Sequence, residues 1–141
     1  MPRAAQKVEM LSNVPIFQGL SKKELAAILR SGREVEHPSG RAITQEGRSG
    51  IGFHLILEGV ASVTARRRRV AEYGPGDYFG EMSLLDGRPR SATVRAETEL
   101  KTLSLASWEF QRLIERYPSI ARKMLIEMSG RIRNLQDSLT H

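Results

Sequence analysis

The sequence predicts an α+β fold in which a jelly-roll β-barrel lies between N-terminal helices and C-terminal helices. Helical patterns occupy about residues 1–32, short apolar and β-branched runs punctuated by glycines occupy 33–106, and helical spacing returns over 107–141. Short strands separated by glycine-rich turns are typical of barrels and jelly rolls. The chain has 141 residues and no internal repeat, so we expect a single domain spanning 1–141.

The N-terminal segment is expected to contain two helices. Ser21 and Glu24 have the spacing of a capping box and precede apolar residues at helical spacing, which predicts a helix from about Ser21 to Ser31. A shorter helix is expected near Gln6 to Leu11, and an apolar cluster from Val14 to Leu20 follows it.

The middle of the chain is expected to form strands. Residues 53–57 and 60–63 alternate in polarity and are joined tightly at Glu58-Gly59, and residues 94–97 and 100–105 form a second pair of expected strands. The run Arg66 to Arg69 falls where a hairpin turn is expected, and we interpret it as a solvated turn. The alternative is a contact with an acidic partner, nucleic acid or lipid headgroups, which the net charge of +6 also allows.

Two further helices are expected at the C-terminal end. One runs from Ser107 to about Tyr117, and Pro118 can occupy the first turn of the other. In the final helix, apolar residues recur at alternating steps of four and three and form one seam: Ala121, Leu125, Met128, Ile132, Leu135 and Leu139. We expect this seam to pack against the chain's own barrel or against a partner such as a second copy.

Composition argues against several classes of protein. The absence of cysteine excludes disulfides, thiolate zinc sites and cysteine nucleophiles. The three histidines, His37, His54 and His141, lack metal-ligand spacing, so no metal and no cupin-type metalloenzyme is expected. No P-loop, nucleophile elbow or catalytic triad is present, so we expect no enzyme. No stretch approaches the roughly 18 apolar residues that span a bilayer, and a cytoplasmic location is expected.

The segment from Phe79 to Val94 has the features of an anion-binding pocket. Gly80 lets the backbone approach a ligand closely, and residues 81–85 are expected to form one helical turn whose N–H groups favour negative charge. The planar guanidinium of Arg90 can pair with two phosphate oxygens. Glu81 would repel a phosphate, but its carboxylate can accept a hydrogen bond from a sugar hydroxyl. A phosphate beside a sugar hydroxyl indicates a nucleotide.

This segment resembles the phosphate-binding cassette of the cyclic nucleotide-binding domain family, which reads approximately F-G-E-x-[AS]-L-x-x-x-x-P-R-[AS]-A-x-V. Phe79-Gly80-Glu81-Met82-Ser83-Leu84 and Pro89-Arg90-Ser91-Ala92-Thr93-Val94 fit the cassette at both ends and in the spacing between them. The resemblance extends over roughly Leu11 to Leu139.

The resemblance implies a regulatory module that binds cAMP, or less favourably cGMP, without a cofactor, and that signals by moving its last helix. The residues it implies for the phosphate are Arg90, Ser91, Ala92, Ser83 and Met82; those for the ribose are Glu81 and Gly80; those that line the base and sugar pocket are Val63, Val70, Arg131, Leu135 and Gln136.

The choice of base and of effector stays open at this stage. Some family members bond adenine with a Thr-Ser pair on the last helix, where this chain has Leu135-Gln136. Ser91 favours cAMP, whereas a threonine in its place would favour cGMP. Alternatives are the sensory half of a transcription factor similar to the catabolite activator protein, the sensor of a cyclic nucleotide-gated channel, and a degenerate interaction module. The chain carries no DNA-binding motif, and the expected partner is an unknown effector or a second copy bound through the last helix.

Overall fold

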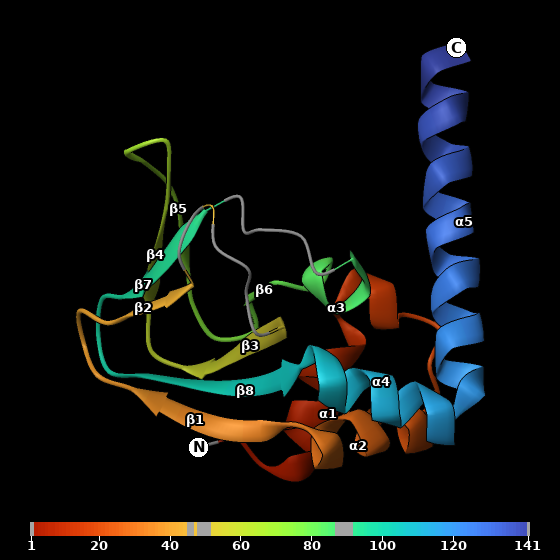
Figure 1. The fold of residues 1–141 in the computed structure, drawn as a ribbon, viewed down its shortest axis with the longest axis horizontal. Helices are drawn as coiled ribbons and strands as arrows, with labels where there is room; N and C mark the ends of the chain where they lie inside the picture. Colours follow the sequence, from red (N-terminus) through yellow and green to blue (C-terminus); the bar gives the residue numbers. More distant parts are fainter. Residues whose placement is uncertain (1, 45–46, 48–51, 87–91, 141) are drawn as a thin grey trace.

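A computed structural model describes residues 2–44, 47, 52–86 and 92–140 of the chain (Figure 1). The helices are α1 (Ala4–Ser12), the 3-10 helix η1 (Pro15–Phe17), α2 (Lys22–Ser31), α3 (Ser83–Asp86), α4 (Ser107–Arg116) and α5 (Pro118–Thr140). The strands are β1 (Arg33–His37), β2 (Ala42–Thr44), β3 (Gly52–Glu58), β4 (Ala61–Ala65), β5 (Arg68–Tyr73), β6 (Tyr78–Phe79), β7 (Thr93–Ala96) and β8 (Leu100–Ala106).

The strands form two antiparallel four-stranded sheets, in the orders β1-β8-β3-β6 and β2-β7-β4-β5. Only β4 and β5, among the described strands, follow each other within one sheet; every other connection passes between the sheets. This is the double-sheet arrangement of a jelly roll, and helices cover its first sheet (Figure 1). The predicted fold class is confirmed.

The expected strands at 53–57 and 60–63 are present as β3 and β4, and their tight connection at Gly59 is a corner that carries the chain from the first sheet to the second. The connection from β7 to β8 also passes between the sheets, from the second to the first. This second corner contacts the first, because the Val60 N–H donates to Thr98 Oγ1 at 3.1 Å. In contrast, Arg66 and Arg67 form the β4–β5 hairpin turn that the sequence predicted, and both have positive φ.

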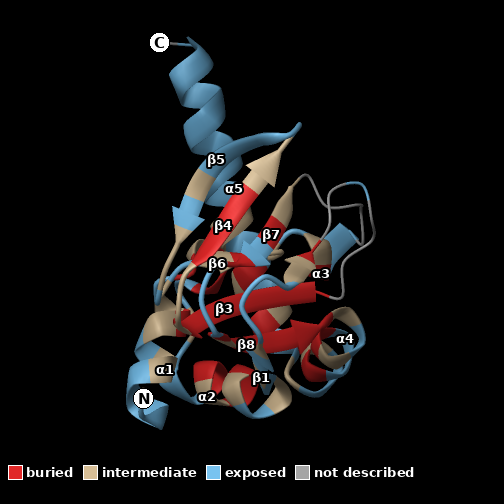
Figure 2. Cartoon of the chain, turned by 90° about the vertical axis from the view of Figure 1, so that its left-hand side faces the viewer, coloured by how far each residue is buried: buried red, intermediate tan, exposed pale blue. Residues whose placement is uncertain are grey.

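Two hydrophobic cores lie on opposite faces of β3. Phe53, Leu55 and Leu57 pack with the helices in one core, and Ile56 packs between the two sheets in the other. β3 is therefore buried on both faces (Figure 2). The predicted apolar cluster near Val14 to Leu20 joins the helical core, because Val14, Ile16 and Phe17 are buried.

The capping box predicted at the start of α2 is confirmed and also anchors α5. The Ser21 hydroxyl accepts from the Glu24 N–H at 3.1 Å, and Glu24 accepts from the Ser21 N–H at 2.8 Å. Glu24 further accepts from Ser119 Oγ and Lys123 Nζ on α5, both at 2.6 Å. Burial alone would raise the pKa of Glu24, but these hydrogen bonds outweigh it and hold the pKa at about 2 instead of 4.5. Ionised Glu24 therefore stabilises the fold above pH 4.5, and this contribution is lost as the pH falls toward 2.

α5 begins at Pro118 as predicted, and it projects beyond the barrel (Figure 1). Ile120 and Met124, one turn apart, are buried against the helical core. Of the two packing partners predicted for the apolar seam, the barrel is excluded for Leu125, Ile132, Leu135 and Leu139, which are each more than half exposed. Packing of these residues on a partner stays a prediction. The helix packs through the face of Ile120 and Met124 and then runs past the sheets. Among the described residues, no helix is long and apolar enough to cross a membrane.

Candidate functional site

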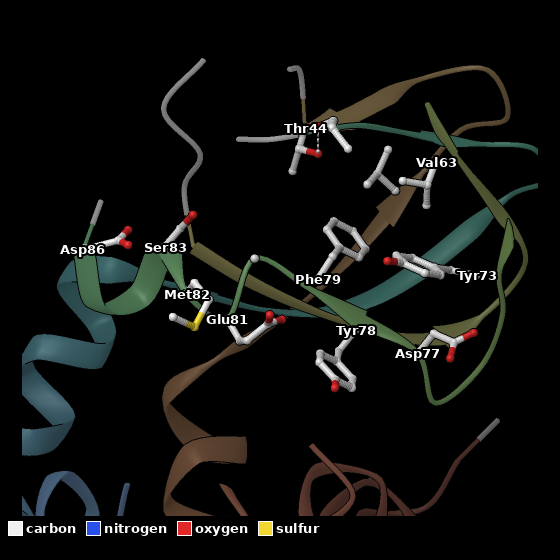
Figure 3. Close-up of a pocket in the computed structure, with 13 residues that line it drawn as sticks. Thr44, Val63, Tyr73, Asp77, Tyr78, Phe79, Glu81, Met82, Ser83 and Asp86 are labelled. Atoms are coloured by element: carbon white, nitrogen blue, oxygen red, sulfur yellow. Dashed lines mark hydrogen bonds between the residues drawn. The ribbon is translucent and has the colours of Figure 1, made fainter. Parts of the chain in front are cut away.

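A cavity of about 630 Å³ opens between the second sheet and the β6–α3 connection. Figure 3 shows its lining, in which an apolar side faces a polar side formed by the start of the cassette. The lining residues are Thr44, Val63, Tyr73, Asp77, Tyr78, Phe79, Gly80, Glu81, Met82, Ser83, Asp86, Ala92 and Val94.

The apolar side of the cavity is built by residues of four strands, β4, β5, β6 and β7. Val63 on β4 and Val94 on β7 are paired across the sheet, and both belong to the core between the sheets. Phe79 on β6 stacks on His54 with ring centroids 5.0 Å apart and on Tyr73 at 6.1 Å. His54 is fixed in turn, because its Nδ1 lies 2.7 Å from Ser104 Oγ. These contacts hold a rigid planar surface at the cavity, against which a flat ring can pack.

The polar side is the turn that leads into α3. Gly80 has φ +82°, which L residues rarely adopt, so the chain turns sharply after β6. The Ser83 N–H donates to the Gly80 carbonyl at 3.1 Å, and the Leu84 N–H donates to the Glu81 carbonyl at 3.2 Å. Within the described residues, the N–H groups of Glu81 and Met82 have no hydrogen-bond acceptor. They are therefore available to an anion in the cavity.

The Glu81 carboxylate acts on two tyrosines at the cavity. Burial first, and the charges of Glu81 and Asp77 second, raise the pKa of the Tyr73 hydroxyl. Burial and Glu81 also raise the pKa of Tyr78, while Arg131 acts in the opposite direction. Both hydroxyls therefore stay protonated, and the Tyr73 hydroxyl can donate a hydrogen bond in the cavity, whereas the Tyr78 ring packs against the helical core. Figure 3 shows the Glu81 carboxylate turned toward these tyrosines.

The structure brings most of the predicted phosphate and ribose residues together. Those that line the cavity are Gly80, Glu81, Met82, Ser83, Ala92 and, from the predicted base pocket, Val63. The predicted helical turn is present as α3, which begins at Ser83 instead of 81. Arg90 and Ser91 lie outside the described residues.

Val70 does not line the cavity and is 60% exposed. The β4–β5 pairing contains a bulge, because Val63 pairs with Ala71 while Thr64 pairs with Arg69. Val70 is the extra residue of this bulge, and a bulge changes which side chains face inward. The inward positions of β5 are Ala71 and Tyr73, which pack against the core between the sheets.

The three base-pocket residues predicted on α5 also lie outside the cavity lining. Arg131, Leu135 and Gln136 are all exposed on the part of the helix that projects from the barrel. The charge of Arg131 nevertheless acts on a lining residue, because it opposes the rise in the pKa of Tyr78.

Sequence reasoning missed several lining residues: Thr44, Tyr73, Asp77, Tyr78 and Asp86. Asp77 had a local signal, since it closes the Gly74 to Asp77 turn by accepting from the Gly74 N–H at 2.8 Å. Thr44 had none, because it meets the cassette through long-range contacts, its pairing with Val94 on β7 and the 3.5 Å hydrogen bond from its Oγ1 to the Ala92 carbonyl. No group of three or more His, Asp or Glu side chains among the described residues is arranged to hold a metal ion.

Comparison with known proteins gives relatives for most of the chain. A cyclic nucleotide-gated potassium channel of Mesorhizobium japonicum is 40% identical over 125 residues, which are 86% of this chain and 35% of the channel. A cAMP-dependent protein kinase regulatory subunit of Emericella nidulans is 37% identical over 115 residues, which are 80% of this chain and 28% of that protein. The chain thus spans about a third of the length of the curated relatives it matches.

Two solved structures share the fold of this chain at 30% sequence identity. The N-terminal domain of a transcriptional regulator from Streptomyces coelicolor superposes with a TM-score of 0.84 at 30% identity, over 91% of this chain and 95% of that one. The catabolite activator protein of Thermus thermophilus superposes with a TM-score of 0.69 at 30% identity, over 89% and 62%. The family model described as cyclic nucleotide-binding domain matches residues 34–117, which run from the second residue of β1 to the end of α4 and include the whole cassette. This chain therefore belongs to the cyclic nucleotide-binding domain family.

Proposed function

We propose that this chain is a regulatory module that binds cAMP in the cavity beside α3. The observation that carries the proposal is the composition of the polar side, where the Glu81 carboxylate stands beside backbone N–H groups that have no acceptor among the described residues. A carboxylate suits a hydroxyl and free N–H groups suit an anion, and a cyclic nucleotide offers both within one sugar-phosphate unit. The cavity of about 630 Å³ is of the size that small-molecule sites have.

In the proposed complex, Glu81 accepts a hydrogen bond from the ribose 2′-hydroxyl, with Gly80 giving the sugar room. Arg90 and Ser91 bind the cyclic phosphate together with the backbone at Met82, Ser83 and Ala92. The base lies toward Val63 and the stacked rings of Phe79 and Tyr73. The assignment of Arg90 and Ser91 rests on the cassette sequence.

Two observations favour adenine over guanine. Ser91 occupies the position where a threonine would favour cGMP. The regulatory subunit from Emericella nidulans, 37% identical to this chain, belongs to a kinase that is named as cAMP-dependent. We therefore expect cAMP to bind more tightly than cGMP.

Calorimetric titration with cAMP, cGMP, linear AMP and 2′-deoxy-cAMP tests this function. We expect cAMP to bind best and AMP not to bind measurably. Glu81→Ala should weaken cAMP binding about tenfold, because a hydrogen bond to a charged group is lost. The same variant should bind cAMP and 2′-deoxy-cAMP equally, since both changes delete one contact. If Glu81→Ala bound 2′-deoxy-cAMP about tenfold more weakly than cAMP, Glu81 would not be the residue that contacts the 2′-hydroxyl. If no nucleotide gave a heat of binding, the proposed function would be refuted.

We further propose that α5 transmits the signal. Its first turns are anchored through Glu24, Ile120 and Met124, whereas its later turns carry exposed apolar side chains. Movement of the later turns toward the cavity would bring Arg131, Leu135 and Gln136 to the base and cover apolar surface. Such a shift requires that cAMP binds the two arrangements unequally. Hydrogen exchange of α5 amides should therefore slow when cAMP is added, and unchanged exchange at saturation would contradict the switch.

A further inference from the structure

A second cavity lies between α2 and α4, away from the nucleotide cavity. It has a volume of about 470 Å³, and none of its lining residues also lines the nucleotide cavity. α2 and α4 pack against each other beneath the first sheet (Figure 1). The floor of the groove is apolar, with Ala27 and Leu113 buried and Tyr117 half-buried.

The walls of this groove carry three arginines, Arg30, Arg112 and Arg116. All three are exposed, and none has a carboxylate partner among the residues that the structure describes. Arg112 and Arg116 are one turn apart on α4, and like charges at this spacing destabilise an isolated helix. The groove therefore concentrates positive charge that the chain itself does not neutralise.

The Glu109 carboxylate also lines the groove, but both of its oxygens already have partners in the chain. Glu109 Oε1 accepts from the Ala106 N–H at 2.9 Å at the start of α4, and Oε2 lies 3.5 Å from Arg33 Nε. Helix ends account for part of the basic character, because Arg30 and Arg116 lie in the last turns of α2 and α4. Arg112 lies in neither last turn, so helix stability does not explain its place in the groove.

We infer that this groove binds an acidic segment of a partner protein. Carboxylate side chains would pair with the arginine forks. Ala27 and Leu113 are already buried, so an apolar side chain of the segment would pack at the half-buried Tyr117 ring, where the Arg116 guanidinium lies 5.7 Å from the ring centroid. The arginines line a groove of about 470 Å³ between two helices, which suits the side chains of a single peptide segment. A second copy of this chain fits the groove poorly, since each copy has a net charge of +6. The inference does not depend on the proposed function.

Fluorescence anisotropy with a labelled peptide of alternating glutamate and leucine tests the inference on the full chain. We expect salt-sensitive binding, with a matched glutamine–leucine peptide binding much more weakly. Arg112→Gln combined with Arg116→Gln should weaken the acidic peptide about tenfold, because two exposed charge pairs are lost. The variant should keep the circular dichroism spectrum and the urea unfolding midpoint of the unsubstituted chain, which shows that it is folded.

The control variant combines Arg122→Gln with Arg133→Gln, which removes the same charge from exposed positions on α5 outside the groove. It should bind the acidic peptide within about twofold of the unsubstituted chain. An equal loss in both variants would mean that net charge alone attracts the peptide, and the inference would fail. It would also fail if the acidic peptide did not bind. Tighter groove-dependent binding of a DNA oligonucleotide or of phosphatidylserine vesicles would assign the groove to phosphates instead.

Discussion

Gly59→Ala is expected to lower the free energy of unfolding by about 3 to 5 kcal/mol, which is among the largest effects of a single substitution. Gly59 has φ +94°, a conformation that costs an L residue about 1 to 2 kcal/mol. A Cβ there would also lie 2.2 Å from the carbonyl oxygen of Glu99 and 3.0 Å from the Cα of Leu100. Both atoms are backbone, so no side-chain rotation can relieve the clash.

The clash arises because two sheet-to-sheet corners share this end of the barrel. Gly59 links β3 to β4, and Thr98 and Glu99 link β7 to β8. The corners are joined by the Val60 N–H to Thr98 Oγ1 and by the Glu97 N–H to the Val60 carbonyl at 2.9 Å. Separating the corners to admit a methyl group would therefore break hydrogen bonds in both connections.

Gly40→Ala is the matched control for this prediction. Gly40 has φ +89°, almost the same as Gly59, but a Cβ there would meet no atom within 4 Å. Urea denaturation of the two variants separates the cost of the positive φ from the cost of the backbone clash. Gly40→Ala should lower the free energy of unfolding only by the cost of the positive φ, about 1 to 2 kcal/mol. Equal losses in the two variants would show that the close approach of the corners contributes nothing.

Local patterns in the sequence predicted the elements that local chemistry determines. The capping box at Ser21 and Glu24, the turn at Arg66 and Arg67 and the start of α5 at Pro118 depend on residues within a few positions of each other, and all are present. The start of the cassette, from Phe79 to Asp86, belongs with them, because Gly80 and the turn after it occupy one contiguous segment.

The failed expectations depend on contacts between distant segments. Val70 faces outward because of a bulge in the pairing of β4 with β5, and alternation along one strand does not reveal a bulge. β3 alternates in sequence, yet both of its faces are buried because helices cover one and the second sheet covers the other. The seam of α5 has helical spacing, but the helix packs on the neighbouring face that carries Ile120 and Met124. Periodicity predicts a helix and does not tell which neighbour the helix meets.

Arg90→Ala is expected to weaken cAMP binding by about one to two decades. The reason is the loss of the charge-assisted contact with the cyclic phosphate that we propose for Arg90, worth roughly 1.5 to 3 kcal/mol. The cAMP affinity of Arg90→Lys should lie between those of the unsubstituted chain and Arg90→Ala, because lysine keeps the charge but not the planar fork that pairs with two oxygens. Calorimetric titration of the unsubstituted chain, Arg90→Lys and Arg90→Ala with cAMP measures the loss of the fork and the loss of the charge separately.

Arg95→Ala provides the control, since it removes the same charge from a position close in sequence. Arg95 is exposed on β7, and its Nη1 donates to the Gly40 carbonyl at 2.7 Å, away from the residues that line the cavity. If the phosphate is held by a specific contact, Arg95→Ala should leave cAMP affinity within about twofold, because an exposed charge at a distance is screened. If Arg90→Ala and Arg95→Ala weakened binding equally, the general positive charge of the chain would attract the nucleotide. Arg90 would then lose its role, and the anion would be held by the backbone N–H groups before α3.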